Sequence, residues 1–181
     1  MTIQYIAPKY FTEFQCIGSE CEDNCCRAGW NISVDKVHYK RIKKAFGGSK
    51  LDREFFSNRI KRNKGKSGII ATDQSYAYIQ ASDDGVCGFQ DEQELCSLHS
   101  RFGHQILPYT CDTYPRLYNL LAGERVEAYG TLSCPEIARK CLLGEGTLDL
   151  VELAGEEFAG VKLNYSAGLD LSKTSLYNQH I

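Results

Sequence analysis

The stretch Cys16-Ile-Gly-Ser-Glu-Cys21-Glu-Asp-Asn-Cys25-Cys26-Arg-Ala-Gly-Trp30 decides how this chain is read, because it places four thiols within eleven residues. Five more cysteines follow at wider spacings, at positions 87, 96, 111, 134 and 141. Clustered thiols serve as disulfide partners, as ligands of a metal ion or an iron-sulfur cluster, or as redox catalysts. Other features of the sequence are needed to decide which of these three roles the cysteines have.

The cellular compartment bears on that choice. Residues 1–10 have no basic region, no long apolar run and no small-residue cleavage site, so they do not have the pattern of a secretory signal. This predicts a cytoplasmic protein, in which thiols stay reduced, and an odd number of cysteines, nine, cannot all pair within one chain. Metal or cluster ligation is therefore favoured over disulfides, while unrelated buried thiols stay open as a third interpretation.

Length and composition are those of an ordinary globular protein. The chain has 181 residues, of which 43% are hydrophobic and 24% charged, and no apolar run is long enough to cross a membrane. We expect one cysteine-rich domain over residues 1–163, long enough to bury a core, and a frayed tail over residues 164–181.

The charge is unevenly distributed. Residues 35–66 carry twelve Lys or Arg and three Asp or Glu, a balance of +9, so the rest of the chain carries −11. This segment is either a solvated helical face or a docking surface for an acidic protein or polyanion. Nucleic acid is not an expected partner, because the basic residues are not interleaved with stacking aromatic residues.

Periodicity predicts an α+β fold, namely a small helix-rich, cysteine-rich domain with a short β-hairpin, organised around a metal or iron-sulfur site. Residues 1–32 lack a helical pattern, and Trp30 is expected to close this lobe over the site. The remaining elements are predicted from caps, apolar spacing and Gly or Pro stops. The first is a basic helical hairpin over residues 33–66, in which one helix is capped at Ser33 and ended by Gly47-Gly48, and a second starts at Ser49 with Leu51, Phe55, Phe56 and Ile60 on one side. A β-hairpin of 68–72 with 76–80 follows, and then a helix over 98–106 and a loop over 109–116. The last element is a helix opened by a Ser133–Glu136 capping box and ended by Gly144.

Thiolates suit both a structural zinc ion and an iron-sulfur cluster. The spacing of Cys87 and Cys96 around a polar loop indicates that a turn presents both thiols to one centre. Neighbouring side chains diverge on regular backbone, so Cys25 and Cys26 are expected to share one metal only if the backbone there is irregular. His99, and less directly His104, could replace a thiol on zinc, whereas Cys141 is expected in the core.

One cysteine-based mechanism is not supported. Radical enzymes that use S-adenosylmethionine carry a C-x3-C-x2-C loop, and although Cys21 and Cys25 have the first spacing, the third position is Ala28.

Four ordered blocks carry a resemblance to a known family. They are 16–30, quoted above; Cys87-Gly-Phe with Leu95-Cys-Ser-Leu-His99; Thr110-Cys-Asp-Thr-Tyr-Pro-Arg116; and Leu132-Ser-Cys-Pro-Glu-Ile-Ala-Arg139. Together they resemble the flagellin lysine-N-methylase family and, more broadly, cysteine-rich zinc- or iron-chelating domains. Members of the methylase family are considerably longer, so the resemblance implies that this chain is the N-terminal portion, either a shortened product or a naturally short relative.

The resemblance implies a lysine N-methyltransferase that acts on flagellin, with a 4Fe-4S cluster and S-adenosylmethionine as cofactors. The ligand candidates that follow from it are Cys21, Cys25, Cys26, Cys87, Cys96 and Cys111, with Cys16 and Cys134 behind them. Tyr109, Tyr114 and Tyr129 are candidates to surround the lysine amine, and Glu136 to accept its proton. The alternative is a non-catalytic zinc- or iron-chelating structural or interaction module. No glycine-rich loop that would bind the methyl donor is visible.

Overall fold

The structure is a computed structural model that describes residues 4–29, 32–65, 70–121 and 125–154. The chain divides into two compact units, here called the sheet unit (residues 1–16 with 115–181) and the cysteine unit (residues 17–114). Each unit is described by itself. The prediction of one domain over residues 1–163 stays a prediction, because two compact units can still unfold as one cooperative domain. The predicted frayed tail lies outside the described residues.

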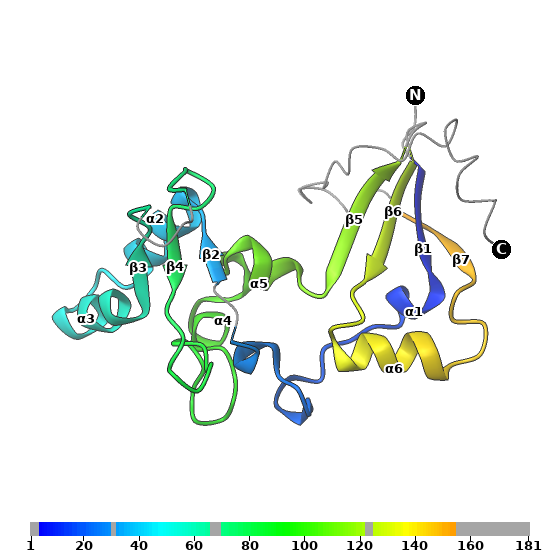
Figure 1. Cartoon of the computed structure of the whole chain (residues 1–181), viewed down its shortest axis with the longest axis horizontal. Coiled ribbons are helices and arrows are strands. Elements are labelled where there is room, and N and C mark those ends of the chain that lie inside the picture. Colours follow the sequence, from blue (N-terminus) through cyan, green and yellow to red (C-terminus); the bar gives the residue numbers. More distant parts are fainter. Residues whose placement is uncertain (1–3, 30–31, 66–69, 122–124, 155–181) are drawn as a thin grey trace. The chain divides into compact units, whose positions relative to one another are not determined.

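The sheet unit is built on four strands in the order β5-β6-β1-β7 (Figure 1). β5 and β6 form an antiparallel pair, β1 lies parallel to β6, and β7 lies antiparallel to β1. The strands are β1 (Gln4–Pro8), β5 (Arg116–Leu121), β6 (Arg125–Gly130) and β7 (Leu150–Leu153). β1 is thus paired on both edges by strands that come more than a hundred residues later.

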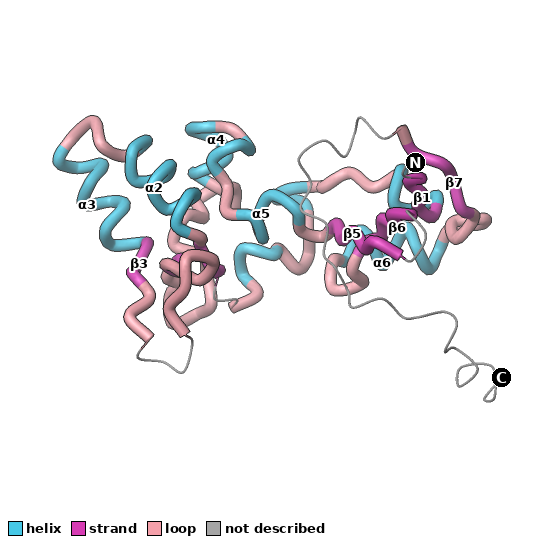
Figure 2. The backbone as a smooth tube through the Cα atoms, turned by 90° about the horizontal axis from the view of Figure 1, so that it is seen from above, coloured by secondary structure: helices cyan, strands magenta, loops and turns pink. Residues whose placement is uncertain are grey.

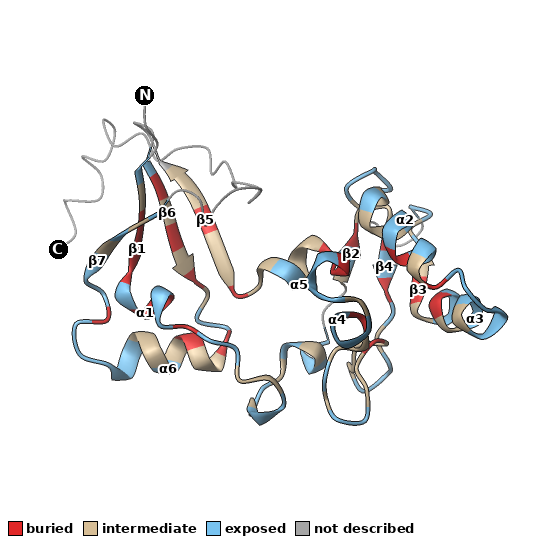
Figure 3. Ribbon diagram, turned by 180° about the vertical axis from the view of Figure 1, so that it is seen from behind, coloured by how far each residue is buried: buried red, intermediate tan, exposed pale blue. Residues whose placement is uncertain are grey.

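Two helices complete the sheet unit, α1 (Lys9–Thr12) and α6 (Pro135–Leu143). Ile137 of α6 is fully buried, and a side chain at Gly130 would place a Cβ 2.4 Å from its Cδ1 atom. Only glycine lets β6 and α6 approach this closely. Figure 3 shows the buried residues of β1 and β6, which form part of this core.

The prediction for residues 1–32 was partly wrong, since β1 and α1 both lie within that stretch. Trp30 lies outside the described residues. The helix predicted near residue 133 is confirmed, including its end at Gly144, but its capping box is not formed. Cys134 occupies the N-cap position without a side-chain cap, and Ser133 instead lies within hydrogen-bond distance of Thr131.

The cysteine unit contains a second sheet, of three short antiparallel strands in the order β2-β4-β3. They are β2 (Ile32–Val34), β3 (Ile60–Arg62) and β4 (Ala77–Ile79). The predicted hairpin of 68–72 with 76–80 was wrong. Residues 70–72 form no strand, residues 68–69 lie outside the described part, and β4 pairs instead with β2 and β3.

The basic segment does contain two helices, α2 (Lys36–Ala45) and α3 (Lys50–Arg59), which follow one another in Figure 2. Asp35 rather than Ser33 caps α2, with its Oδ1 atom accepting from the backbone N–H groups of Val37 and His38. Ser49 caps α3 as predicted. Leu51, which was predicted on the same side of this helix as Phe55 and Phe56, is 77% exposed.

Five short helical turns lie among the described residues of the rest of the cysteine unit. They are η1 (Gly18–Glu20), η2 (Cys25–Arg27), α4 (Ser97–Phe102), η3 (His104–Ile106) and α5 (Tyr109–Thr113). The helix predicted over 98–106 is broken at Gly103, whose φ of 80° lies in the left-handed region. Cys111 lies on α5 and not in a loop, which corrects the prediction for 109–116.

The core of the cysteine unit is aromatic. Phe46 is fully buried and stacks on Phe55 with ring centroids 5.4 Å apart, while Phe102 meets it edge-on at 5.1 Å. Phe89 joins them at 6.0 Å and reaches toward the cysteines. Aromatic pairs of this kind add about 0.5–1.5 kcal/mol each beyond the area that they bury.

The fold class is therefore mixed α+β, as predicted, but the β content is larger than a short hairpin because two sheets are present. Organisation around a metal or cluster stays a prediction. Among the helices of the described ranges, none combines the length and the apolar character that a membrane crossing requires.

Candidate functional site

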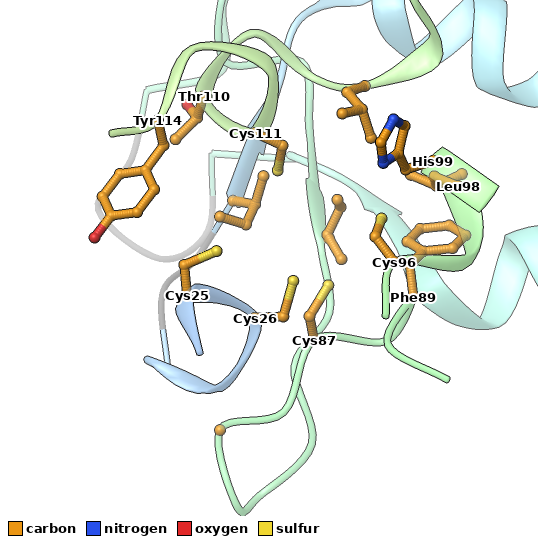
Figure 4. A pocket seen from close by; sticks show the side chains of 14 residues that line it. Cys25, Cys26, Cys87, Phe89, Cys96, Leu98, His99, Thr110, Cys111 and Tyr114 are labelled. Atoms are coloured by element: carbon orange, nitrogen blue, oxygen red, sulfur yellow. The ribbon is translucent and has the colours of Figure 1, made fainter. Parts of the chain in front are cut away.

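Five cysteines from four separate stretches of the sequence line one cavity of the cysteine unit, about 170 Å³ in volume. They are Cys25, Cys26, Cys87, Cys96 and Cys111. Figure 4 shows their sulfur atoms directed into the same space. The other walls are mainly apolar, from Ile32, Ile79, Phe89, Leu98 and Leu107, and they limit the contact of the thiols with water.

Cys25 and Cys26 both reach the cavity because the backbone there is irregular. They lie on the 3-10 turn η2, which Asn24 caps by accepting the backbone N–H of Cys26 at 2.9 Å. This is the condition under which the sequence allowed two adjacent thiols to share a centre. The Asn24 side chain also donates to the backbone carbonyl of Glu94 at 3.1 Å, which joins this turn to the loop before Cys96.

A backbone hydrogen bond holds Cys87 next to Cys26, with the Cys87 N–H donating to the Cys26 carbonyl at 2.7 Å. Just before Cys87, at Gly85, the backbone passes close to the backbone of Gly29. A Cβ there would lie 3.2 Å from the Cα of Gly29, and the φ of 77° favours glycine. Sequence reasoning predicted that Cys87 and Cys96 face one centre, and both side chains line the cavity.

The loop that carries Cys96 is held by its own acidic residues. The Asp91 carboxylate accepts the N–H groups of Gln93 and Leu95, at 3.0 and 2.9 Å. Glu94 is the one non-glycine residue with a positive φ, 61°, in the described part, and its carboxylate lies 3.1 Å from Arg27 beside η2. A strained backbone held by contacts on both sides is typical of a constrained functional loop.

The thiols of the cavity are electrostatically coupled. The Cys26 S–H group donates hydrogen bonds to Cys25 and to Cys87, which lowers the pKa of each of those thiols to about 7. The same hydrogen bonds raise the pKa of Cys26, since its proton is shared between two acceptors. Burial raises the pKa of Cys96 and, more strongly, of Cys111. Two thiolates are therefore available near neutral pH without any metal.

Cys21 does not line the cavity in the described structure, and its Sγ lies 3.4 Å from the carbonyl of Asp23. Cys16, Cys134 and Cys141 belong to the sheet unit, where Cys16 is exposed and Cys134 is buried. All nine cysteines are free thiols, so the disulfide interpretation is not what the structure contains.

The predicted catalytic residues are divided between the two units. Tyr114 lines the cysteine cavity, whereas Tyr109 lies one turn earlier on α5, where burial raises its pKa. Glu136 and Tyr129 belong to the sheet unit. The Glu136 carboxylate is ion-paired there with Arg139 and, at 3.5 Å, with Lys140, while the Tyr129 hydroxyl accepts a hydrogen bond from Asn119.

Histidine adds one further group to the cavity. His99, a possible zinc ligand in the sequence analysis, lines the cavity from α4. His104 points elsewhere, with its Nδ1 atom 3.5 Å from Asp112. Sequence reasoning missed the supporting roles of Asn24 and Glu94. An Asn before a short turn is a recognisable signal of a helix cap, but no sequence pattern indicates that a Glu will adopt a positive φ.

The donor set has the chemistry of an iron-sulfur cluster site. Iron-sulfur clusters are held by Cys thiolates, four for a 4Fe-4S cluster, and the cavity supplies five. Within the described ranges, no three Cys, His, Asp or Glu residues are arranged to hold one metal ion.

The relatives of this chain include two lysine-N-methylases, from Salmonella typhimurium and Salmonella choleraesuis. Each is 30% identical over 148 residues, which is 80% of this chain and 34% of the relative. The flagellar biosynthetic protein FliU of Salmonella muenchen is 30% identical over 138 residues, 75% of either chain. No family model and no solved structure matches the sequence.

The fold and the cavity define a small α+β protein with a cysteine-lined site. With the similarity just described, the chain belongs to the flagellin lysine-N-methylase family. It spans about a third of the length of the two lysine-N-methylases that it matches.

Proposed function

We propose that this chain takes part in the N-methylation of lysine residues of flagellin, and that four of the five cavity thiols hold a 4Fe-4S cluster. One observation carries the proposal, namely the convergence of Cys25, Cys26, Cys87, Cys96 and Cys111 on one cavity in a chain of the lysine-N-methylase family. When bound, such a cluster would supply a compact, negatively charged centre that ties four stretches of chain together.

The reaction itself is a displacement at carbon. The lone pair of a neutral lysine nitrogen forms a bond to the sulfonium methyl of S-adenosylmethionine, and the carbon–sulfur bond breaks with its electron pair going to sulfur. The nitrogen then releases one proton. With a pKa near 10.4, deprotonating the lysine costs about 4.6 kcal/mol at pH 7, so a desolvated site or a base has to assist.

Residues at the cavity could provide part of this assistance. The phenol of Tyr114 and the imidazole of His99 are the polar groups at its wall that are able to hold or accept a proton. Tyr109 stays a neutral phenol, since burial raises its pKa. The proposed role of Glu136 as a proton acceptor competes with its two ion pairs, which favour a structural role for that carboxylate.

The basic surface of α2 and α3 is the proposed docking face for the protein substrate. Lysines 40, 43, 44 and 50 are all exposed there. Opposite charge on a partner increases association rates and orients the encounter. The expected signature is a rate of methylation that falls with rising salt.

Metal content tests the cluster. Anaerobically purified protein is expected to be brown and to contain iron and sulfide, and Cys87→Ser, Cys96→Ser and Cys111→Ser are each expected to lose most of the iron. Cys16→Ser and Cys141→Ser are the matched controls and should retain it. Colourless protein that contains stoichiometric zinc would contradict the cluster and support the alternative function, a zinc-binding structural module.

Methyl transfer needs its own assay. Cluster-loaded protein is incubated with flagellin and isotope-labelled donor, and mass increments on lysine are expected to disappear in Cys96→Ser and Cys111→Ser. A loaded cluster without increments would contradict the catalytic role. It would support the alternative of a non-catalytic chelating or interaction module, for which the cysteine-lined cavity is the motivating observation.

A further inference from the structure

The sheet unit has a pocket of its own, about 670 Å³ in volume, that the cysteine site does not involve. Its polar lining comes from α1, β5, β6 and α6, and its rim is formed by leucines. The polar members are Tyr10, Asn119, Glu127, Tyr129, Thr131 and Cys141, and the leucines are Leu117, Leu132, Leu148 and Leu150.

Strand geometry directs the key side chains to this pocket. Glu127 and Tyr129 are two residues apart on β6 and therefore point to the same side of the sheet. Their direct partners on β5 are Asn119 and Leu117, whose side chains share that side. The alternate residues of β6, such as Val126, are buried on the opposite side.

Glu127 is the charged group of this lining. Its residue is half-buried, and its carboxylate forms neither a hydrogen bond nor an ion pair with any residue that the structure describes. A carboxylate that is partly removed from water without a compensating partner carries a desolvation cost, which a bound cation would offset. The pocket is therefore chemically suited to a positively charged ligand.

Two tyrosines line the same pocket as this carboxylate, and their hydroxyl groups are already hydrogen-bonded. Asn119 Nδ2 donates to the Tyr129 hydroxyl at 3.1 Å, and the Gly130 N–H donates to the Tyr10 hydroxyl at 3.2 Å. Burial raises the pKa of Tyr10, and the charges of Cys141 and Glu127 add to this effect, so the phenol stays neutral. Aromatic rings held in this way present faces that attract cations.

The rim is unusually apolar for an exposed surface. Leu132, Leu148 and Leu150 are 54%, 67% and 61% exposed. Exposed leucines next to a lone carboxylate match a ligand that has an apolar stem and a charged end.

We infer that this pocket binds a lysine side chain of the protein substrate other than the one that is methylated, with the ammonium at Glu127 near the two tyrosines and the four-carbon stem along the leucines. The identity of the ligand as lysine rests on the proposed function, while the preference for an alkylammonium rests on the pocket. The sulfonium of the methyl donor is the competing cation, and it is an arm of the test.

The experiment measures binding to the full chain without donor, flagellin or cluster loading. N-acetyl-lysine methylamide is titrated while the backbone amide resonances of residues 125–130 are followed by NMR, and the uncharged N-acetyl-norleucine methylamide is titrated in parallel. We expect saturable shifts with the lysine analogue and at least about tenfold weaker binding of the norleucine analogue, because a hydrogen-bonded charge is lost.

Variants locate the site. Glu127→Gln preserves shape and is expected to weaken lysine binding at least about tenfold. Glu152→Gln makes the same charge change on β7, on the far side of β1, where the Glu152 side chain accepts from Gln4, and should leave affinity within about twofold. Tyr129→Leu removes one ring and is expected to cost about threefold, which keeps the inference testable if Glu127→Gln folds poorly.

Several results would overturn the inference. They are equal binding of the norleucine analogue, equal weakening by Glu127→Gln and Glu152→Gln, or S-adenosylmethionine displacing the lysine analogue from the same residues. Lysine binding without methyl transfer would leave this site standing and remove the proposed function. Methyl transfer that is unaffected by Glu127→Gln would overturn this site and leave the proposed function standing.

Discussion

The two units of this chain differ in what holds them together. The sheet unit relies on four strands with continuous backbone pairing and a core of aliphatic and aromatic side chains, in which Ile137 packs directly on Gly130. The cysteine unit has three-residue strands, an aromatic core, and loops around a cavity whose walls include five thiols. Regular hydrogen bonding therefore stabilises the first unit, whereas in the second the proposed centre would tie the cavity loops together.

The largest effect is expected on removing that centre. Stripping the cluster anaerobically with a chelator should lower the stability of the cysteine unit by more than about 5 kcal/mol, because ligand binding adds to folding free energy. Hydrogen exchange followed by mass spectrometry should show lost protection over residues 80–96, while β1 and β6 stay protected. Equal loss in both units would remove the distinction drawn between them.

Truncating the aromatic core comes next. Phe46→Ala should destabilise the cysteine unit by about 3–5 kcal/mol, since it deletes a fully buried ring with several aromatic neighbours. Urea unfolding measures the change. Val37→Ala, at a position that is 64% exposed on α2, is the matched control and should change stability by less than about 0.5 kcal/mol. A similar loss in the control would show that α2 packs differently.

The corresponding change in the sheet unit is Ile137→Ala, which should cost about 3 kcal/mol through the cavity that it leaves beside Gly130. Hydrogen exchange of each unit is compared in the same sample. If only the sheet unit loses protection, the two units unfold separately. If both lose it equally, residues 1–163 behave as the single domain that the sequence predicts.

The smallest effect concerns the thiols in metal-free protein. Since the pKa of Cys25 and Cys87 is lowered to about 7, alkylation of both should rise as the pH increases through 7, because the thiolate is the reactive form. Cys26→Ala removes the S–H donor, so both pKa values should rise and alkylation at pH 7 should slow by about tenfold.

Mass spectrometry of the alkylated peptides reports each site separately. Cys111 should react only at higher pH, since burial raises its pKa. Cys141→Ala is the control and should leave the pH profile of Cys25 unchanged. An unaltered midpoint in Cys26→Ala would mean that Cys26 does not donate to its neighbours.

The helices were the most predictable part of the fold. Ser49 marked the start of α3, and Gly144 the end of α6, because caps and stops act over a few neighbouring residues. The strands of the sheet unit carried no comparable local signal. β1 was overlooked because its partners β6 and β7 are far away in sequence, and pairing of this kind is decided by tertiary packing.

The site shows the same division. From the sequence, the cysteine blocks and their spacing were sufficient to predict that thiols from distant stretches face one centre, since only their chemistry and order were needed. The tertiary structure decided which of the cysteines line the cavity. The turn at η2 brought both Cys25 and Cys26 to the cavity, and Cys21 was left outside it.

The types and the order of the residues thus indicate the chemistry before the fold is known, as the nine cysteines and the similarity of the sequence to the lysine-N-methylases illustrate. The lone carboxylate of Glu127 could not be recognised in this way. The lack of a partner for its carboxylate among the described residues, and its place in one pocket with Tyr10 and Tyr129, arise only when α1, β5 and β6 meet in space, because burial and pairing are properties of the folded chain and not of any residue alone.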